Sequence, residues 1–432
     1  MTVLPAAPSG GHVPAMRIGL DTGEPGTGTA APRQVRPSGR GEGGAALLAA
    51  ILASALLVAA PPGVRAQGGG DLSTPEKLGE ALFFDTNLSK NRTQSCASCH
   101  SPDHAFTDPR QTPAAGGAVS LGDDGTSLGD RNAPTAAYAK FSPPFGRSSK
   151  PGLFQGGQFH DGRAADLAAQ AGGPPLNPLE MGMPDKASVV ARLKENPAYV
   201  SAFDTLYGAG VLNSPDAGYG AMTRAIAAFE TTPVFAPFDS KYDRSLRGEA
   251  KLTEQEELGR VLFFSQQFTN CSLCHRLDQQ GGAAGETFTS YEFHNIGVPQ
   301  NAAARAAAGL KPGSRDLGLA QNPALKGKAK TAQAGRFKTP TLRNVGVTGP
   351  YMHNGVFKDL RTVILFYNTY NTKNPARHIN PETGKPFDPP EVEQNISLTE
   401  LETGPALDDK RIDALVAFLK TLTDRRYEHL QN

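Results

Sequence analysis

The chain has 432 residues, and its 43 Lys and Arg against 42 Asp and Glu give a formal net charge of +1. This balance provides no electrostatic reason to expect binding to nucleic acid or to an anionic membrane surface. The length suffices for two or three domains. The 48 Gly and 35 Pro residues favour long loops over a bundle of long helices.

The first 66 residues have the composition of an extension followed by a targeting segment. Residues 1–44 are rich in Gly, Pro, Ala and Arg without apolar periodicity, which predicts disorder. Residues 45–60 are apolar throughout, and a small-x-small pattern ends at Ala66. Such a run is short for a membrane span and typical of a signal peptide. We therefore expect export to the periplasm, with cleavage near Ala66; an uncleaved anchor is the alternative.

A short pattern then occurs twice. Residues 78–100 read LGEALFFDTNLSKNRTQSCASCH, and residues 258–275 read LGRVLFFSQQFTNCSLCH. Each copy begins with Leu-Gly, continues with an LFF run predicted to be helical, and ends in C-x-x-C-H. Self-similarity over so many positions indicates a duplicated structural unit.

The C-x-x-C-H pentapeptide is the attachment signature of a c-type haem. Its two thiols form thioethers with the haem vinyl groups, and its His binds one face of the iron. A zinc ribbon or a redox dithiol also uses C-x-x-C pairs, but neither requires a His after the second Cys in both copies. We expect two haems and, because all four cysteines are used, no structural disulfide. The predicted attachment residues are Cys96, Cys99 and His100 for one haem and Cys271, Cys274 and His275 for the other.

Further elements follow in chain order. A capping Ser-Thr-Pro-Glu begins a helix at residue 73, and Leu252-Thr253-Glu254 begins the matching helix. Residues 116–151 are predicted to be a loop, and residues 232–250 a connector. The stretch after the second motif, up to residue 334, has little structural signal. Helices are predicted at residues 164–171, 186–195, 221–230 and 410–422.

With both motifs in place, the chain resembles the bacterial di-haem cytochrome c peroxidase family and its MauG-like branch. The matching stretches are residues 99–108, 130–135, 159–170, 293–299, 338–344 and 350–355. The resemblance implies an all-α fold of two tandem cytochrome c-like domains with long loops and one covalently bound haem in each. The expected organisation is an extension and signal peptide (1–66), an N-terminal domain (67–235), a linker (236–250) and a C-terminal domain (251–432).

The resemblance also implies where peroxide is activated. The N-terminal haem, on His100, is peroxidatic in this family and leaves one iron face open. Counting along the family pattern, Glu180 falls on the distal carboxylate, and Gln170 and Pro174 fall on residues lining the same pocket. A carboxyl group there moves a proton from the inner to the outer peroxide oxygen so that water leaves.

The second haem should receive electrons and pass them on. Its far ligand is Met in the peroxidases and Tyr in MauG, and in this chain Tyr367 falls on that position, with Met352 as the competing ligand. A phenolate stabilises ferric iron, so a Tyr-ligated haem should be a poorer electron acceptor. His353 lies in a family motif and is expected beside the second haem.

A calcium site follows from the same resemblance. Asn132 would contribute a side-chain oxygen, and Thr348 and Pro350 backbone carbonyls, with waters completing the shell. Ligation by oxygen alone, with part of the shell hydrated, suits Ca²⁺.

The chain departs from the family pattern at two positions. The loop at residues 122–129 contains no His that could close the first haem, so that haem is expected to be open without prior reduction. His160 stands where the family has a Trp between the haems, and imidazole is harder to oxidise than indole. Stepwise electron hopping through His160 is therefore not expected; the alternatives are direct tunnelling between the haems and a His160 that hydrogen-bonds between propionates.

The leading hypothesis is a periplasmic peroxidase that reduces H₂O₂ to water with electrons from a small c-type cytochrome or cupredoxin. The alternative, favoured by Tyr367, is a MauG-like oxidase that uses peroxide to modify side chains of a partner protein. A non-catalytic di-haem electron carrier is a third hypothesis, against which Glu180 argues. A homodimer is compatible with this sequence.

Overall fold

The computed structural model describes residues 70–112, 114–277, 285–402 and 404–431, all in one compact unit. The predicted extension, signal peptide and cleavage site lie outside these residues, so they stay predictions. Within the described ranges, no helix is long and apolar enough to cross a membrane.

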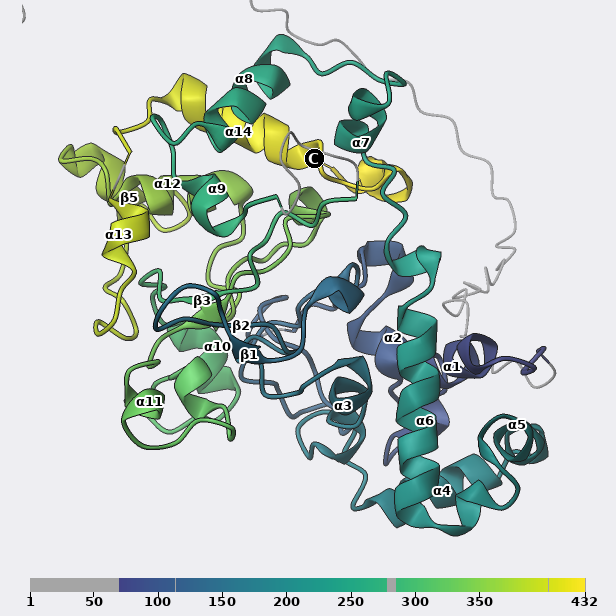
Figure 1. The fold of residues 1–432 in the computed structure, drawn as a ribbon. Helices are drawn as coiled ribbons and strands as arrows, with labels where there is room; N and C mark the ends of the chain where they lie inside the picture. Colours follow the sequence, from purple (N-terminus) through teal and green to yellow (C-terminus); the bar gives the residue numbers. More distant parts are fainter. Residues whose placement is uncertain (1–69, 113, 278–284, 403, 432) are drawn as a thin grey trace, which may run out of the picture. The chain divides into compact units, whose positions relative to one another are not determined.

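The described chain is mostly helical, which confirms the coarse prediction of fold class (Figure 1). The predicted helices at 164–171, 186–195 and 410–422 correspond to α3, α4 and α14, and 221–230 is the second part of α6. The helices are α1 (Pro75–Phe83), α2 (Cys96–Cys99), α3 (Leu167–Ala171), α4 (Lys186–Lys194), α5 (Pro197–Tyr207), α6 (Pro215–Glu230), α7 (Lys241–Leu246), α8 (Glu254–Phe264), α9 (Cys271–Cys274), α10 (Ala302–Ala307), α11 (Gly327–Thr331), α12 (Leu360–Asn368), α13 (Leu398–Leu401) and α14 (Asp409–Lys420).

Short sheets are the feature that the all-α prediction lacked. The described residues form three antiparallel pairs of two-residue strands, which are too short to show an alternating pattern in the sequence. The pair β3–β4 matters most, because it brings two distant segments together beside the site described below. The pairs are β1 (Gly146–Arg147) with β2 (Phe154–Gln155), β3 (Phe293–His294) with β4 (Phe337–Lys338), and β5 (Ile379–Asn380) with β6 (Lys385–Pro386).

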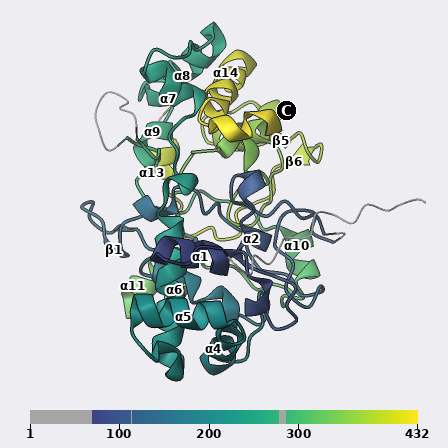
Figure 2. The same ribbon diagram turned by 90° about the vertical axis from the view of Figure 1, so that its right-hand side faces the viewer.

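Two large apolar cores are built on the two copies of the repeated pattern. In the first, α1 packs against α6, and Phe83 lies edge-on to Phe106, Phe229 and Phe235. In the second, α8 packs against α14, and Phe263 contacts Phe288 and Phe418. Figures 1 and 2 show α1 beside α6 and α8 beside α14. We call the parts around these cores the first and second halves.

The cap residues explain where the paired helices begin. The Thr74 side chain accepts a hydrogen bond from the Lys77 N–H at the start of α1. Thr253 and Glu256 form a capping box at the start of α8. α6 begins earlier than expected, because Ser214 caps it and Pro215 occupies its first turn.

The segment between the halves is anchored rather than free. Residues 241–246 form α7, and Tyr242 packs edge-on to Phe288 and Phe418 in the second core. The halves are also tied by a hydrogen bond of 2.6 Å from the Tyr138 hydroxyl to Asp424 Oδ1, both buried. This boundary carries the candidate site.

Candidate active site

The two C-x-x-C-H segments have the same local geometry. Each Cys pair frames a single helical turn, α2 or α9, and the His follows as its C-cap. His100 Nδ1 lies 3.2 Å from the Phe106 carbonyl oxygen, and His275 Nδ1 lies 3.0 Å from that of Phe288. Because a carbonyl only accepts, Nδ1 carries the hydrogen in each ring, and Nε2 is left to bind a metal.

The environment of these residues fits covalent haem attachment. The four cysteines are free, and burial raises the pKa of the Cys96 and Cys271 thiols. Burial also lowers the pKa of both histidines, that of His275 to about 4, so the rings are neutral, as ligation requires. The pairs belong to different cores and do not form one four-cysteine site. Across the described ranges, no three His, Cys, Asp or Glu residues are grouped so as to hold a metal ion.

A cavity of about 370 Å³ lies next to His275, at the boundary of the two halves. This volume falls in the range of small-molecule and cofactor sites. Cys271 and Cys274 line it from the second half, and residues 132–135 and 158–160 line it from the first. The second predicted haem site is therefore a hollow that both halves form.

Both candidates for the far iron ligand line this cavity. Tyr367 projects from α12, and Met352 comes from the loop before it. Burial is the main cause that raises the pKa of Tyr367, and the nearby Cys271 and Cys274 add to the effect. The Tyr367 hydroxyl forms no hydrogen bond with any described residue, whereas that of Tyr370 donates to the Ile296 carbonyl at 3.1 Å. Tyr367 as the ligand stays a prediction that its position supports.

The three residues predicted for the first pocket come from neighbouring segments: Gln170 belongs to α3, and Pro174 and Glu180 belong to the segment that follows it. The Gly173 N–H donates to the Gln170 carbonyl at 2.8 Å, and the Met181 N–H donates to that of Pro174 at 3.3 Å. These bonds bring Glu180 back beside Pro174. The predicted roles of Gln170, Pro174 and Glu180 stay predictions, although their proximity agrees with a shared pocket.

Glu180 has the environment of a carboxyl group that exchanges protons. Burial raises its pKa, and the Arg163 charge and a 2.8 Å hydrogen bond from Asn177 Nδ2 to Glu180 Oε1 offset this only in part. Its charge in turn acts on the Cys99 thiol, which places Glu180 near the first attachment site.

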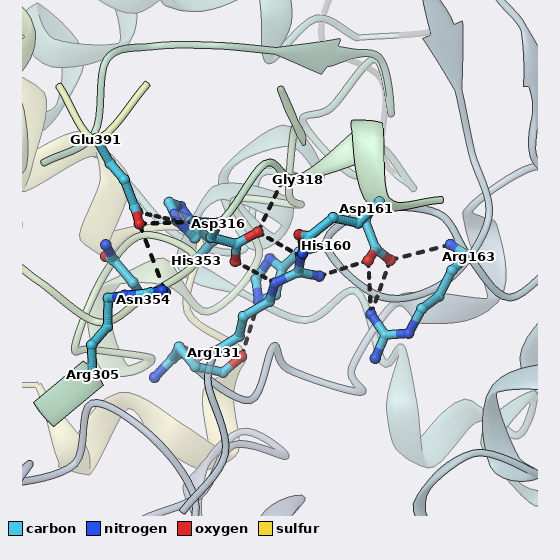
Figure 3. A network of polar contacts seen from close by, with 12 residues as sticks. Arg131, His160, Asp161, Arg163, Arg305, Asp316, Gly318, His353, Asn354 and Glu391 are labelled. Carbon is cyan, nitrogen blue, oxygen red and sulfur yellow. Dashed lines mark hydrogen bonds and ion pairs between the residues drawn. The ribbon is translucent and has the colours of Figure 1, made fainter. Parts of the chain in front are cut away.

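Arg131 is an important residue that the motif analysis did not single out. Its guanidinium group donates to Asp161 of the first half at 2.8 Å and to Asp316 of the second at 2.6 Å (Figure 3). Burial alone would raise the pKa of Asp316, but the bonds from Arg131 bring it to about 2. Arg131 therefore joins the halves through two ionised carboxylates. It occurs in the matching stretch 130–135, which was the signal available in the sequence.

His160 lines the cavity and is fixed by its neighbours. Its Nε2 donates to the Asn132 carbonyl at 2.9 Å, and its own carbonyl accepts from the Lys338 N–H at 2.8 Å. Burial lowers the pKa of His160 to about 4, so the ring is neutral.

The three predicted calcium ligands also line this cavity. Asn132 is held on three sides, because its N–H donates to the His353 carbonyl at 2.8 Å, its amide NH₂ to Ala118 at 3.0 Å, and its carbonyl accepts from His160. These bonds leave Asn132 Oδ1 as the atom without a hydrogen-bond partner among the described residues. A fixed side-chain oxygen near Thr348 and Pro350 suits calcium, and the site stays a prediction.

His353 lies on the cavity wall, where the sequence predicted it. Its ring stacks on Phe337 with centroids 3.5 Å apart, and its Nε2 is 4.0 Å from Glu391 Oε2. Burial lowers the pKa of His353 to about 3, which indicates a neutral residue with a structural role.

Comparison with known proteins places this site in a family. The family model described as di-haem cytochrome c peroxidase matches residues 73–251. The methylamine utilization protein MauG of Paracoccus denitrificans is 57% identical over 353 residues, which are 82% of this chain and 89% of that protein. The chain belongs to the di-haem cytochrome c peroxidase and MauG family. It is therefore an oxidoreductase of the peroxidase class, as the resemblance implied.

Other members agree with this assignment. The cytochrome c peroxidase Ccp of Escherichia coli is 35% identical over 64% of this chain and 49% of that protein. The crystal structure of the diheme peroxidase BthA from Burkholderia thailandensis shares 33% identity over 82% of this chain and 86% of that chain, with a TM-score of 0.71. Members of the family named as peroxidases and as MauG thus both match, and both functional hypotheses are supported.

Proposed function

We propose that this chain is an exported MauG-like enzyme that uses peroxide to oxidise side chains of a partner protein. The observation that carries this proposal is the position of Tyr367, which lines the same cavity as His275 and whose hydroxyl has no hydrogen-bond partner among the described residues. A phenolate ligand would stabilise ferric iron and disfavour uptake of an electron from a small donor. The 57% identity to a MauG protein supports the same function.

The proposal includes one covalent c-type haem in each half, on the two cytochrome c-like domains predicted from the sequence. His100 would bind the first iron and His275 the second, each through Nε2, because Nδ1 is committed to a backbone carbonyl. The haem irons supply the redox chemistry with peroxide. Signal-peptide export accounts for the compartment, since c-type haem is attached outside the bacterial inner membrane.

The protein's own contribution at the first site is proton transfer by Glu180. Because burial raises the pKa of Glu180, its carboxylate is a stronger base than an exposed one. It would take a proton from the inner peroxide oxygen and give that proton to the outer oxygen. Gln170 and Pro174 would shape the pocket around this carboxyl group. Asn177 holds Glu180 Oε1, so Oε2 is the oxygen available to peroxide.

We also propose Ca²⁺ at Asn132, Thr348 and Pro350. The fixed Asn132 Oδ1 would be its side-chain ligand. Asn132 lines the cavity beside His275 and bonds to His160 and to His353. Calcium bound at Asn132 would therefore help to hold the two halves together.

The second candidate is a peroxidase that takes electrons from a small c-type cytochrome or cupredoxin. Relatives named cytochrome c peroxidase and Met352 on the same cavity wall favour it. In that case Met352, rather than Tyr367, would bind the second iron.

Steady-state assay with reduced small c-type cytochrome and H₂O₂ tests the proposal. Slow oxidation of the cytochrome, together with peroxide-dependent modification of a protein substrate, is the expected result. Rapid turnover with the cytochrome would reject the MauG-like function in favour of the peroxidase. If no reaction with peroxide is found in either assay, the protein is a non-catalytic electron carrier and both enzymatic functions are rejected.

A further inference from the structure

Lys338 is a cation on the wall of the cavity beside His275, and none of the described carboxylates forms an ion pair with it. It belongs to β4, and its Nζ donates to the Gly157 carbonyl and, at 3.4 Å, to the Ser142 hydroxyl. Both acceptors are neutral. In the described part of the chain, Lys338 forms no ion pair.

The nearest carboxylate is already neutralised. Asp161 acts on Lys338 through its charge, but its Oδ1 accepts from Arg163 at 2.9 Å and its Oδ2 from Arg131 at 2.8 Å. Arg131 is in turn shared with Asp316. Arg131, Arg163 and Lys338 thus share two carboxylates, Asp161 and Asp316, and both of these bond to an arginine rather than to Lys338.

An ammonium group enclosed by protein without a counter-ion is unfavourable, and it either loses its proton or binds an anion. Burial lowers the pKa of Lys338 to about 8, and the charge of Asp161 offsets this only in part. Lys338 lines the cavity, and so does Ser142, whose hydroxyl accepts from Nζ, so an anion bound in the cavity can approach the ammonium group.

The inference rests on the proposed haem at His275, whose two propionates are the anions that this cofactor brings into the cavity. We propose that Lys338 would bind a propionate of the haem that His275 holds, at the part of the cavity wall where Lys338 bonds to His160. Three observations agree. The Lys338 N–H bonds to the His160 carbonyl, the segment 338–342 lines the cavity with His275, and the Lys338 side chain is fixed by the first half.

The arrangement gives Lys338 a positioning role that spans the boundary. Its strand belongs to the second half, while Gly157, Ser142 and His160, to which it bonds, belong to the first. A propionate on Nζ would therefore hold the second haem to the first half of the chain.

The test measures the reduction potential of each haem in the full holoenzyme by optical redox titration. In K338M the potential of the His275 haem should fall, because loss of the neighbouring positive charge stabilises ferric iron. K338R, which keeps the charge, should stay closer to wild type. The matched control is K140M, because Lys140 also donates to a carbonyl, that of Thr231, but lines a different pocket. A potential in K338M equal to that in K140M would overturn the proposal.

If K338M does not fold, a second measurement uses the charge-conserving variants K338R and K140R. The propionate carboxylate band in the reduced-minus-oxidised infrared spectrum should move in K338R and not in K140R; an unmoved band in K338R overturns the inference. Failure of the proposed function can also be distinguished from failure of the role of Lys338. Mass spectrometry that finds no haem on Cys271 and Cys274 in wild type rejects the proposed function, whereas haem present with an unchanged potential rejects only the role of Lys338.

Discussion

Gly79 of α1 lies directly against the backbone carbonyl of Ala225 in α6, so closely that a Cβ on Gly79 would overlap that oxygen. Gly259 of α8 meets Ala414 of α14 in the same way. The two helix pairs thus cross at a glycine in each half, which explains the Gly of the repeated Leu-Gly pattern. The partner helices carry a matching repeat, AIAAF in α6 and ALVAF in α14, which the sequence analysis had not recognised.

Replacing Gly79 or Gly259 with Ala should separate the crossing helices. Because the obstructing atom is backbone, the free energy of unfolding should fall by roughly 1–3 kcal/mol or more for each substitution. Thermal and denaturant unfolding of the holoprotein measures this. The control is Gly220→Ala in α6, where the nearest atom to the new Cβ is the end of the Arg224 side chain at 3.4 Å. Equal stability of Gly79→Ala and Gly220→Ala would contradict the role of the crossing.

Glu180→Gln should lower the rate of reaction with peroxide by roughly 10²–10⁴, the range for loss of a general acid-base group. In the wild type, the rate should fall as the pH drops through the Glu180 pKa, which burial raises above its ordinary value. Stopped-flow measurement against pH checks both expectations. Glu80→Gln, an exposed acid on α1, should change neither the rate nor the profile.

Tyr367→Phe should change the optical and paramagnetic resonance spectra of one haem, because an iron ligand is lost. Tyr370→Phe is the control, since the Tyr370 hydroxyl already donates a hydrogen bond to the Ile296 carbonyl. If the spectrum changes in Met352→Leu and stays constant in Tyr367→Phe, Met352 is the ligand and the peroxidase function gains support.

The burial of Glu230 predicts that the free energy of unfolding depends on pH. Glu230 is buried at the end of α6, its Oε2 has no hydrogen-bond partner within the described ranges, and burial raises its pKa to about 8. Since the folded state holds the proton more tightly than the unfolded state, the stabilising contribution is complete below the unfolded pKa. As the pH rises toward 8 this contribution is lost, and the free energy of unfolding falls by about 4 kcal/mol.

Glu230→Gln should remove that dependence, so the variant gains stability over the wild type at pH 9 relative to pH 5. Denaturant unfolding at both pH values measures the difference. Glu254→Gln, an exposed acid in the first turn of α8, serves as the reference. A wild-type stability that does not fall between these pH values would show that Glu230 is ionised in the folded protein.

Removal of calcium should reduce the activity if Asn132, Thr348 and Pro350 bind it. A chelator should inactivate the enzyme and lower its melting temperature, and Ca²⁺ should restore both while Mg²⁺ should not, because Mg²⁺ requires a smaller and more regular shell. Activity that is indifferent to the chelator, with no metal found by elemental analysis, would exclude the site.

Much of the site could be predicted from short patterns. C-x-x-C-H predicts the attachment residues, because that chemistry needs those residues at that spacing, and the LFF runs correctly indicated the helices α1 and α8. The family pattern predicts Glu180, Gln170 and Pro174 as pocket residues, and backbone hydrogen bonds fold Glu180 back beside Pro174. The two-residue strands could not be predicted, since they contain no period to detect.

The sequence by itself determined the family and the enzyme class that follows from it, and it predicts two haem attachment units. Only the tertiary structure decided which distant residues share a charge or a hydrogen bond. Arg131 meets Asp161 and Asp316, 30 and 185 residues away, and the Lys338 ammonium reaches Gly157, 181 residues away. Such pairings depend on how the loops of one half close on the other, and no local pattern encodes them, because the energy of a buried charge is set by all that surrounds it.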